Sequence, residues 1–389
     1  MKILHTSDWH IGKRLGRYDR SDEYREVLSQ VTVVADEEEV DAVLHSGDLF
    51  DRPFPTVEAM NIGLQGLVAL SRKGTRPVVV IAGNHDSPGL FEALAPFLRH
   101  QNVHLVGEIK RPEEGGVLNL DTTSGPLVVS CFPFLREARA FHAWDPAAEH
   151  YKNYADRLSA ISSAYAAYAE ETASGNAVTV LLAHFLVGGA KVHGHGAPRG
   201  ERELHMGEAY EANADAIPSG PQYVALGHIH APQSVPGSRV PAEYAGSLLE
   251  LDFGEAGEQK RVVVVDLDVG LPAVVRSIPI TGGRRLARVT GEWGDVANRD
   301  DLREAYLDLT VETVGPDPGL AERALAEFDY VVKVRAEYPR IEIETHIREG
   351  MSLDSLYSLY YEDHHGAEPS DAVAAAFREI MEEAGYAAS

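Results

Sequence analysis

The chain has 389 residues, enough for two or three domains, and with 44% hydrophobic and 24% charged residues it has the composition of a globular protein. No apolar run approaches the ~20 residues of a membrane-spanning helix, and the N-terminus becomes charged and polar too early to be a signal peptide. The net charge of −25 argues against a nucleic-acid or anionic-membrane surface along the whole chain, although residues 1–110, with 12 basic and 16 acidic residues, are much nearer to neutral.

Strand and helix patterns alternate through the first hundred residues. Short apolar segments end in polar residues, and each is followed by a segment with helical periodicity. This alternation is typical of an α/β sheet that is covered by helices. The expected strands are Lys2–Thr6, Asp41–His45 and Pro77–Ala82, and the expected helices are Glu23–Val40, Thr56–Arg72 and Pro88–Arg99.

The middle of the chain is rich in strands. A long helix is expected at about His150–Thr172, and the Gly-rich segment Gly188–Arg202 is typical of a flexible loop. Apolar runs predict buried strands on both sides of these segments. They lie at Leu127–Cys131, Val178–Ala183, Tyr223–Leu226, Arg261–Asp266 and Ala273–Ile280.

A domain boundary is predicted at Thr281-Gly282-Gly283. Beyond it, strands at Arg285–Thr290, Tyr306–Val311 and Tyr330–Glu337 and helices near Asn298–Ala305 and Gly319–Phe328 predict a small α+β unit. The tail from Gly350 to Ser389 is predicted to form two helices and carries eight acids and one base, so it is not a DNA-binding arm. The predicted domains are 1–280, 281–345 and 346–389.

Several predicted strands end in carboxylate, imidazole or amide side chains. Because ligands bind beyond the carboxyl ends of strands in open α/β sheets, these groups are expected to meet. Each motif alone also fits a turn, but their joint occurrence favours a divalent metal site, with Mn²⁺ or Fe²⁺ preferred and Zn²⁺ or Mg²⁺ as alternatives. No cysteine takes part, which argues against a structural zinc cluster. The motifs are Asp8-x-His10, Gly47-Asp48, Gly83-Asn84-His85-Asp86, His184 and Gly227-His228-Ile229-His230.

The order of these motifs resembles the calcineurin-like metallophosphoesterase superfamily. The segments MKILHTSDWHIGK, HSGDLFD, AGNHDSP and ALGHIH resemble, more specifically, the SbcD family, the nuclease subunits of bacterial SbcC–SbcD complexes. The motif resemblance covers about residues 1–251. It implies an α/β fold of four layers, a metallophosphoesterase β-sandwich flanked by helices, followed by a small α+β capping domain and a helical C-terminal tail.

The resemblance also implies two divalent ions per chain, most often Mn²⁺. A carboxylate that binds both ions offsets the repulsion between two cations ~3.5–4 Å apart. Asp48 is the implied bridging ligand. The implied ligands of the first ion are Asp8, His10 and His230, and those of the second are Asn84, His184 and His228.

His85 follows a ligand but, by the resemblance, does not bind metal. It is expected to approach the phosphate and help the leaving oxygen depart. Its ring must be oriented, and Asp86 is the nearest candidate to accept its second N–H. Alternatively, Asp86 caps the helix that starts near Pro88. His85 and Asp86 are therefore the predicted catalytic pair.

A basic run follows the first motif and predicts contacts with DNA phosphates, with a solvated loop as the alternative. Arg52 lies beside Asp51 at the expected rim of the site, where the role of Asp51 stays open because some relatives have a histidine near it. The run consists of Lys13, Arg14, Arg17 and Arg20.

The remaining histidines and the single cysteine are not predicted to carry chemistry. His193, His195 and His205 lie in or beside the Gly-rich loop and are expected to be exposed rather than ligands, and His45 is expected to be a core or edge residue. Cys131 indicates buried packing; it cannot form an internal disulfide and fits a reducing cytoplasm.

The implied activity is that of a metal-dependent DNA phosphodiesterase. By the resemblance, it is a 3′→5′ exonuclease on double strands and an endonuclease on single strands and hairpins, acting in DNA end processing, repair, recombination and replication near the nucleoid. Full activity would need SbcC, an ABC-type ATPase. The alternatives are a stand-alone metallophosphoesterase acting on small phosphodiesters or phosphoproteins, and a regulatory subunit whose site has decayed.

Two apolar surfaces predict protein partners. A homodimer is implied by the family, and the expected helices Thr56–Arg72 and Pro88–Arg99 offer apolar faces for it. The tail offers two helical stripes that suit docking to SbcC. The dimer residues are Met60, Leu64, Leu67, Phe91, Leu94 and Phe97, and the stripes are Leu353, Leu356, Leu359 and Tyr360, and Val373, Phe377, Ile380 and Met381.

Overall fold

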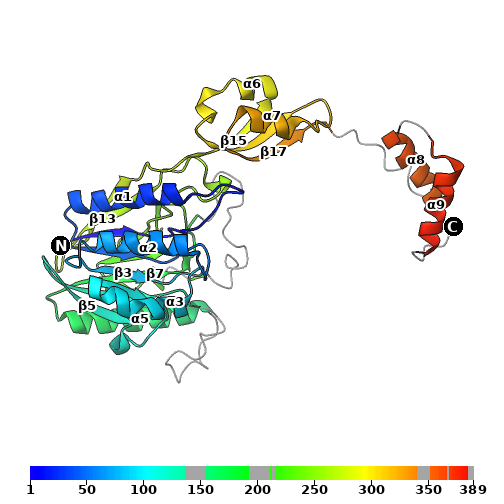
Figure 1. The fold of residues 1–389 in the computed structure, drawn as a ribbon. Coiled ribbons are helices and arrows are strands. Elements are labelled where there is room, and N and C mark those ends of the chain that lie inside the picture. Colours follow the sequence, from blue (N-terminus) through cyan, green and yellow to red (C-terminus); the bar gives the residue numbers. More distant parts are fainter. Residues whose placement is uncertain (136–153, 192–210, 213–215, 340–350, 366–367, 384–389) are drawn as a thin grey trace. The chain divides into compact units, whose positions relative to one another are not determined.

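The computed structural model describes residues 1–135, 154–191, 211–212, 216–339, 351–365 and 368–383 (Figure 1). The chain divides into two compact units, one of Met1–Glu312 with Asp317–Ala336 and one of Thr313–Pro316 with Glu337–Ser389. Among the described helices, none combines the length and the hydropathy of a membrane span.

The first sheet of the larger unit has six strands in the order β14-β13-β1-β2-β3-β4. The four strands from β1 to β4 are parallel, and β13 and β14 add to the β1 edge in antiparallel register. The strands are β1 Lys2–Thr6, β2 Ala42–His45, β3 Val78–Ile81, β4 Val103–Val106, β13 Arg261–Asp266 and β14 Val274–Pro279.

The second sheet has the order β11-β12-β10-β7-β6-β5. Its central strands β12, β10, β7 and β6 are parallel, and the edge strands β11 and β5 are antiparallel to their neighbours. The strands are β5 Val117–Thr122, β6 Gly125–Phe132, β7 Val178–His184, β10 Tyr223–Gly227, β11 Gln233–Ser234 and β12 Ala242–Tyr244; a separate pair is formed by β8 Leu186–Val187 and β9 Glu211–Ala212.

The two sheets lie face to face with helices on their outer faces. Along β3, Val78 and Val80 pack under the helices of the first sheet, whereas Val79 and Ile81 pack between the sheets, as the two-residue repeat of a strand requires. The predicted four-layer sandwich is confirmed. The covering helices are α1 Ser21–Glu37, α2 Val57–Leu70 and α3 Pro88–Leu98 on the first sheet and α5 Tyr154–Ala173 on the second.

A third sheet, β15-β16-β17, follows the sandwich and has an apolar core cluster of its own. The helix predicted near Asn298–Ala305 is wrong: the chain forms α6 at Trp293–Ala297 and then a 3₁₀ turn. Asn298 follows the last residue of α6, and its side chain caps the helix by donating to the Gly294 carbonyl. The elements are β15 Leu286–Glu292, β16 Tyr306–Glu312, β17 Val331–Glu337 and α7 Leu320–Glu327. The domain boundary at 281 stays a prediction.

Three edge strands of the sandwich, β4, β5 and β11, and the inner strand β12 were not predicted. β4 and β5 flank residues 107–116, where charged residues and glycines interrupt the apolar pattern. Most of the predicted loop Gly188–Arg202 lies outside the described residues, and so do His193, His195 and His205.

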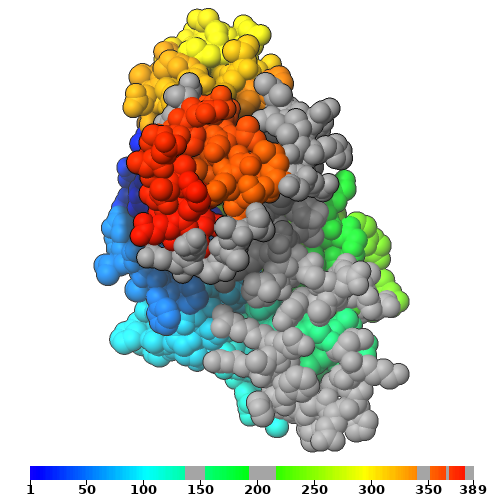
Figure 2. All heavy atoms as spheres, turned by 90° about the vertical axis from the view of Figure 1, so that its right-hand side faces the viewer, coloured from blue at the N-terminus to red at the C-terminus, as the bar shows by residue number. Residues whose placement is uncertain are grey.

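The smaller unit contains the two helices predicted for the tail, α8 Leu353–His365 and α9 Asp371–Glu383. The rings of Tyr357 and Phe377 stack with centroids 3.9 Å apart. Figure 2 shows the two helices, in orange and red, packed side by side.

Candidate metal centre

The predicted ligands all follow strand ends. β1, β2 and β3 are parallel neighbours, so Asp8, Asp48 and Asn84 leave the first sheet at the same edge. His184 ends β7 of the second sheet, and its neighbour β10 ends just before His228. The strand order therefore brings residues that are far apart in sequence to one end of the sandwich.

The backbone at this edge adopts an uncommon conformation. Asp8, His10, Asp48 and His228 have φ angles of +50°, +46°, +55° and +98°. Such left-handed residues are sparsely populated and gather at functional sites, where the surrounding structure holds them in place. Hydrogen bonds provide this hold, because the Asp8 N–H donates to the Gly47 carbonyl at 3.0 Å and the His10 N–H to the Asp48 carbonyl at 3.0 Å.

Asp8, His10 and His230 form a first group, whose ligand atoms all lie within 4.8 Å of one another. Nε2 of His10 and Nε2 of His230 are 3.1 Å apart. Nδ1 of His10 is buried without a hydrogen-bond partner among the described residues, and its distance of 3.8 Å from Asp51 Oδ1 is too long for one. This group presents imidazole and carboxylate donors to one point.

Asn84, His184 and His228 form a second group around the amide oxygen of Asn84. This oxygen lies 3.0 Å from His184 Nε2 and 2.9 Å from His228 Nδ1. Asp48 lies between the two groups, because its Oδ2 is 3.5 Å from both His10 Nε2 and His184 Nε2. Asp48 therefore lies equally close to one imidazole of each group.

The electrostatics of the site follow from burial and from the pairing of carboxylates with imidazoles. Burial raises the pKa of Asp8. Burial would also raise the pKa of Asp48, but the charges of His184 and His85 hold it well below its usual value. Burial would lower the pKa of His184, but Asp48 raises it to about 9. Burial keeps the pKa of His10 well below its usual value, which preserves a neutral imidazole.

The donor set fits a divalent cation. It consists of buried carboxylates, imidazoles and one amide oxygen without sulfur, and it suits Mn²⁺, Fe²⁺ or Zn²⁺ better than a soft metal. A cation would also partner the two buried carboxylates and the facing Nε2 atoms of His10 and His230. The seven ligand assignments stay predictions, and the structure brings all seven residues together.

The orientation of His85 differs from the expectation. Its ring Nδ1 is 2.9 Å from the backbone carbonyl of Asp51, and its backbone N–H donates to Asp48 Oδ1 at 2.8 Å. The Asp86 carboxylate instead accepts from the backbone N–H groups of Leu49, Phe50 and Gly83, and the helix α3 is capped by Ser87. Both interpretations of Asp86 are therefore corrected: it fixes the two loops that carry Asp48 and Asn84.

Asp51 belongs to the site, a role that sequence reasoning left open. Its carboxylate forms a third cluster with His10 and His85, and its Oδ1 is 3.3 Å from Lys13 Nζ. The spacing Asp48-x-x-Asp51 could have indicated this, because Asp51 follows the proposed bridging residue by only three positions. An isolated bridge between Ile11 and Phe50 joins this loop to the loop that carries His10.

The predicted DNA contacts have different environments. The prediction that Arg20 contacts DNA is wrong. Its side chain is 0% exposed, and its guanidinium donates to Glu23 and to the Glu250 carbonyl, so no phosphate can reach it. Arg14 and Arg52 are exposed, and Arg17 lies over the Tyr18 ring. Lys13 pairs with Asp51 at the site. For Lys13, Arg14, Arg17 and Arg52, phosphate contact stays a prediction.

The proposed dimer face is also partly corrected. Leu67 and Phe91 are buried in the core, whereas Phe97 is 75% exposed.

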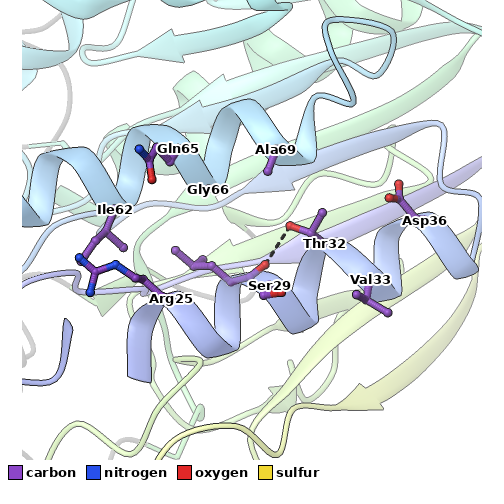
Figure 3. A pocket seen from close by; sticks show the side chains of 10 residues that line it. Arg25, Ser29, Thr32, Val33, Asp36, Ile62, Gln65, Gly66 and Ala69 are labelled. Atoms are coloured by element: carbon purple, nitrogen blue, oxygen red, sulfur yellow. Dashed lines mark hydrogen bonds between the residues drawn. The ribbon is translucent and has the colours of Figure 1, made fainter. Parts of the chain in front are cut away.

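A pocket of about 400 Å³ lies between α1 and α2 (Figure 3). None of the predicted metal ligands, all of them described residues, lines the pocket, so the pocket is separate from the metal centre.

Comparison with known proteins places these observations in a family. Residues 1–232 match the model of the family described as calcineurin-like phosphoesterase. The chain is 30% identical to the SbcD component of nuclease SbcCD from Bacillus subtilis, over 98% of this chain and 97% of that protein. It is 33% identical to the SbcD component of nuclease SbcCD from Rhodobacter capsulatus, over 72% of this chain and 69% of that protein. A crystal structure of TT1561 from Thermus thermophilus matches with a TM-score of 0.38 and 14% identity, over 72% of this chain and 99% of that one.

Proposed function

The chain belongs to the calcineurin-like phosphoesterase family and, within it, to the family of SbcD nucleases, and on this premise we propose that it is a two-metal DNA nuclease that works with an SbcC partner. It is a metal-dependent hydrolase of phosphodiester bonds. The proposal adds the metal count, Mn²⁺ as the preferred ion, 3′→5′ exonuclease activity on double strands and endonuclease activity on single strands and hairpins.

One observation carries the proposal of two ions. Asp48 Oδ2 is 3.5 Å from a nitrogen of each ligand group, which is the position that a bridging carboxylate would take. Bound divalent ions supply Lewis acidity, which activates water and neutralises charge on a phosphate. The amide oxygen of Asn84 contributes a donor without adding negative charge that would repel the phosphate.

The chain's own residues would then handle the leaving group. Nδ1 of His85 is within hydrogen-bond distance of the Asp51 carbonyl, which can only accept, so this nitrogen carries a proton. In the imidazolium form, in which both ring nitrogens carry a proton, Nε2 would give its proton to the departing oxygen while Nδ1 keeps its own on the Asp51 carbonyl. The backbone N–H of His85 also donates to Asp48 Oδ1, so His85, the proposed general acid, is held directly against Asp48, the proposed bridging ligand.

The acidic composition of the chain supports the proposal that DNA binding needs a partner protein. A net charge of −25 predicts weak, salt-sensitive DNA binding by this protein alone. We propose that SbcC supplies most of the DNA affinity and that ATP controls access to the site. We also propose a homodimer, so that two sites can address both strands of a DNA end; analytical ultracentrifugation should show a dimer, and a monomer at working concentration would contradict it.

The proposal is tested by cleavage of a DNA hairpin and of a small chromogenic diester in Mn²⁺, with and without SbcC and ATP. Asp48→Ala should lose both Mn²⁺ and cleavage, whereas His85→Ala should retain Mn²⁺ and lose cleavage. Cleavage of the diester alone, under all conditions, would favour a stand-alone phosphoesterase. Normal cleavage by both variants would overturn the assigned mechanism, and fewer than two Mn²⁺ per chain at saturation would overturn the two-ion site.

A further inference from the structure

We propose that Glu255 is a positioning residue that fixes the ring tautomer of His230 and so presents its Nε2, without a proton, to the metal centre. The inference rests on the function proposed above and deepens it. Glu255 lies outside every motif that the sequence analysis used, at the end of the 3₁₀ turn Phe253–Glu255. Its side chain is 0% exposed, so its negative charge must be satisfied inside the protein.

One carboxylate oxygen of Glu255 faces His230. Oε1 lies 2.8 Å from His230 Nδ1. A carboxylate oxygen can only accept, so Nδ1 carries the proton and, in a neutral ring, Nε2 carries a lone pair instead of a proton. This Nε2 is the atom that faces His10 Nε2 at 3.1 Å. A hydrogen bond from the far nitrogen of a metal-binding histidine to a carboxylate is a common way to fix such a ligand.

The other oxygen of Glu255 is already occupied. Oε2 accepts from Lys260 Nζ at 2.6 Å and from the Leu251 N–H at 3.0 Å. Because these groups can only donate, they need a true oxygen acceptor at this position. Rotation of the carboxylate away from His230 would therefore take the acceptor from the Leu251 N–H and break the shortest ion pair of the buried Lys260.

Lys260 completes the arrangement from the same side. Its side chain is 4% exposed, and its ammonium group also donates to the His230 carbonyl at 3.3 Å and to Glu258 at 3.1 Å. The ring and the backbone of His230 are thus held by one buried ion pair. Glu258 is a second carboxylate on the same ammonium group, and this makes it a matched control for the loss of a negative charge beside Lys260.

The substitution Glu255→Gln tests the tautomer directly. The glutamine oxygen must take the place of Oε2, because Lys260 Nζ and the Leu251 N–H both donate there. Its NH₂ group would then face His230 Nδ1. An NH₂ group donates and would force Nδ1 to accept, which moves the ring proton to Nε2 and towards the metal centre. We expect Mn²⁺ affinity, measured by calorimetry without DNA, to fall by roughly 10–100-fold.

Controls separate positioning from a general loss of structure. Glu258→Gln should leave Mn²⁺ affinity unchanged. In a His230→Ala background, Glu255→Gln should cost little further affinity if Glu255 acts through His230. Equal Mn²⁺ affinity in the wild type and Glu255→Gln would overturn the positioning role but leave the proposed function intact, whereas a wild type that binds no Mn²⁺ would overturn the proposed function itself.

The wild-type chain alone decides the matter if the variant fails to fold. Nitrogen-15 NMR of the metal-free protein should show His230 protonated at Nδ1 and not at Nε2. The opposite tautomer would overturn the proposal, whatever the behaviour of the variants.

Discussion

Gly83 lies directly against Asp48: a Cβ on Gly83 would collide with Asp48 Oδ1 and with the Asp48 backbone nitrogen. The last residues before Asn84 are thus packed against the proposed bridging carboxylate without room for a methyl group. The loop that supplies Asn84 and the loop that supplies Asp48 therefore depend on each other for position.

Gly83→Ala should disturb the site more than the fold. The added methyl must push Asp48 out of place, since overpacking of a tight site costs ~1–3 kcal/mol. We expect Mn²⁺ binding and phosphodiester cleavage to fall together. The matched control is Gly89→Ala in α3, where a Cβ would meet only Ser87 Oγ at an ordinary 3.9 Å. Full Mn²⁺ affinity in Gly83→Ala would contradict the close packing of the two loops.

Arg20 is expected to stabilise the fold rather than bind DNA. It donates to Glu250 O and Glu23, and Glu23 also accepts from the Tyr306 hydroxyl, so the network joins α1 to β16. Arg20→Ala removes a buried cation and leaves the partly buried carboxylate of Glu23 without it, which should lower the free energy of unfolding by ~3–5 kcal/mol.

The control for Arg20 is Arg25 in α1, the helix that Arg20 directly precedes. Arg25 pairs with Asp22 and Glu58, but its side chain is 45% exposed, so Arg25→Ala should cost less than ~1 kcal/mol. Thermal and urea unfolding of the two variants provides the comparison. Equal losses would mean that the Arg20 network does not stabilise the unit.

The sequence predicted the sandwich from local patterns, and its motifs, through their resemblance to a known family, predicted the seven ligands that the structure brings together. Asp8, Asp48 and His228 each follow an apolar strand, and parallel strands bring their ends together. Arg20 and Glu255 could not be predicted in the same way. Their environments are made by residues more than two hundred positions away or by a turn without a motif, and burial of a charged residue leaves no periodic signal.

His5 should make the stability of the protein depend on pH. It is buried, and it bonds the Tyr223 hydroxyl and Ser46 Oγ, both at 2.9 Å. Burial lowers its pKa from 6.5 to about 3. The unfolded chain therefore takes up a proton at a higher pH than the folded chain does. The stabilisation is fully present above pH ~6.5 and is lost as the pH falls towards 3, by up to ~1.4 kcal/mol per pH unit from this group.

Urea unfolding at about pH 7.5 and about pH 5 measures this dependence. His45 contributes in the same direction, because burial also lowers its pKa to about 3, so the wild type alone cannot assign the effect. His5→Gln should lose stability at both pH values but show a smaller difference between them. An unchanged difference would show that His5 does not titrate as its burial requires.

The tail helices should carry the proposed contact with SbcC through their outer side chains. Tyr357 and Phe377 stack on each other inside the pair, whereas Leu359 is 44% and Ile380 62% exposed. Leu359→Asp with Ile380→Asp should therefore abolish co-purification with SbcC while the helix pair and Mn²⁺ binding remain. Deletion of residues 350–389 should have the same effect on assembly. The control Glu379→Gln changes an exposed neighbour without adding charge to the apolar surface, and retained assembly in the double variant would exclude this surface as the contact.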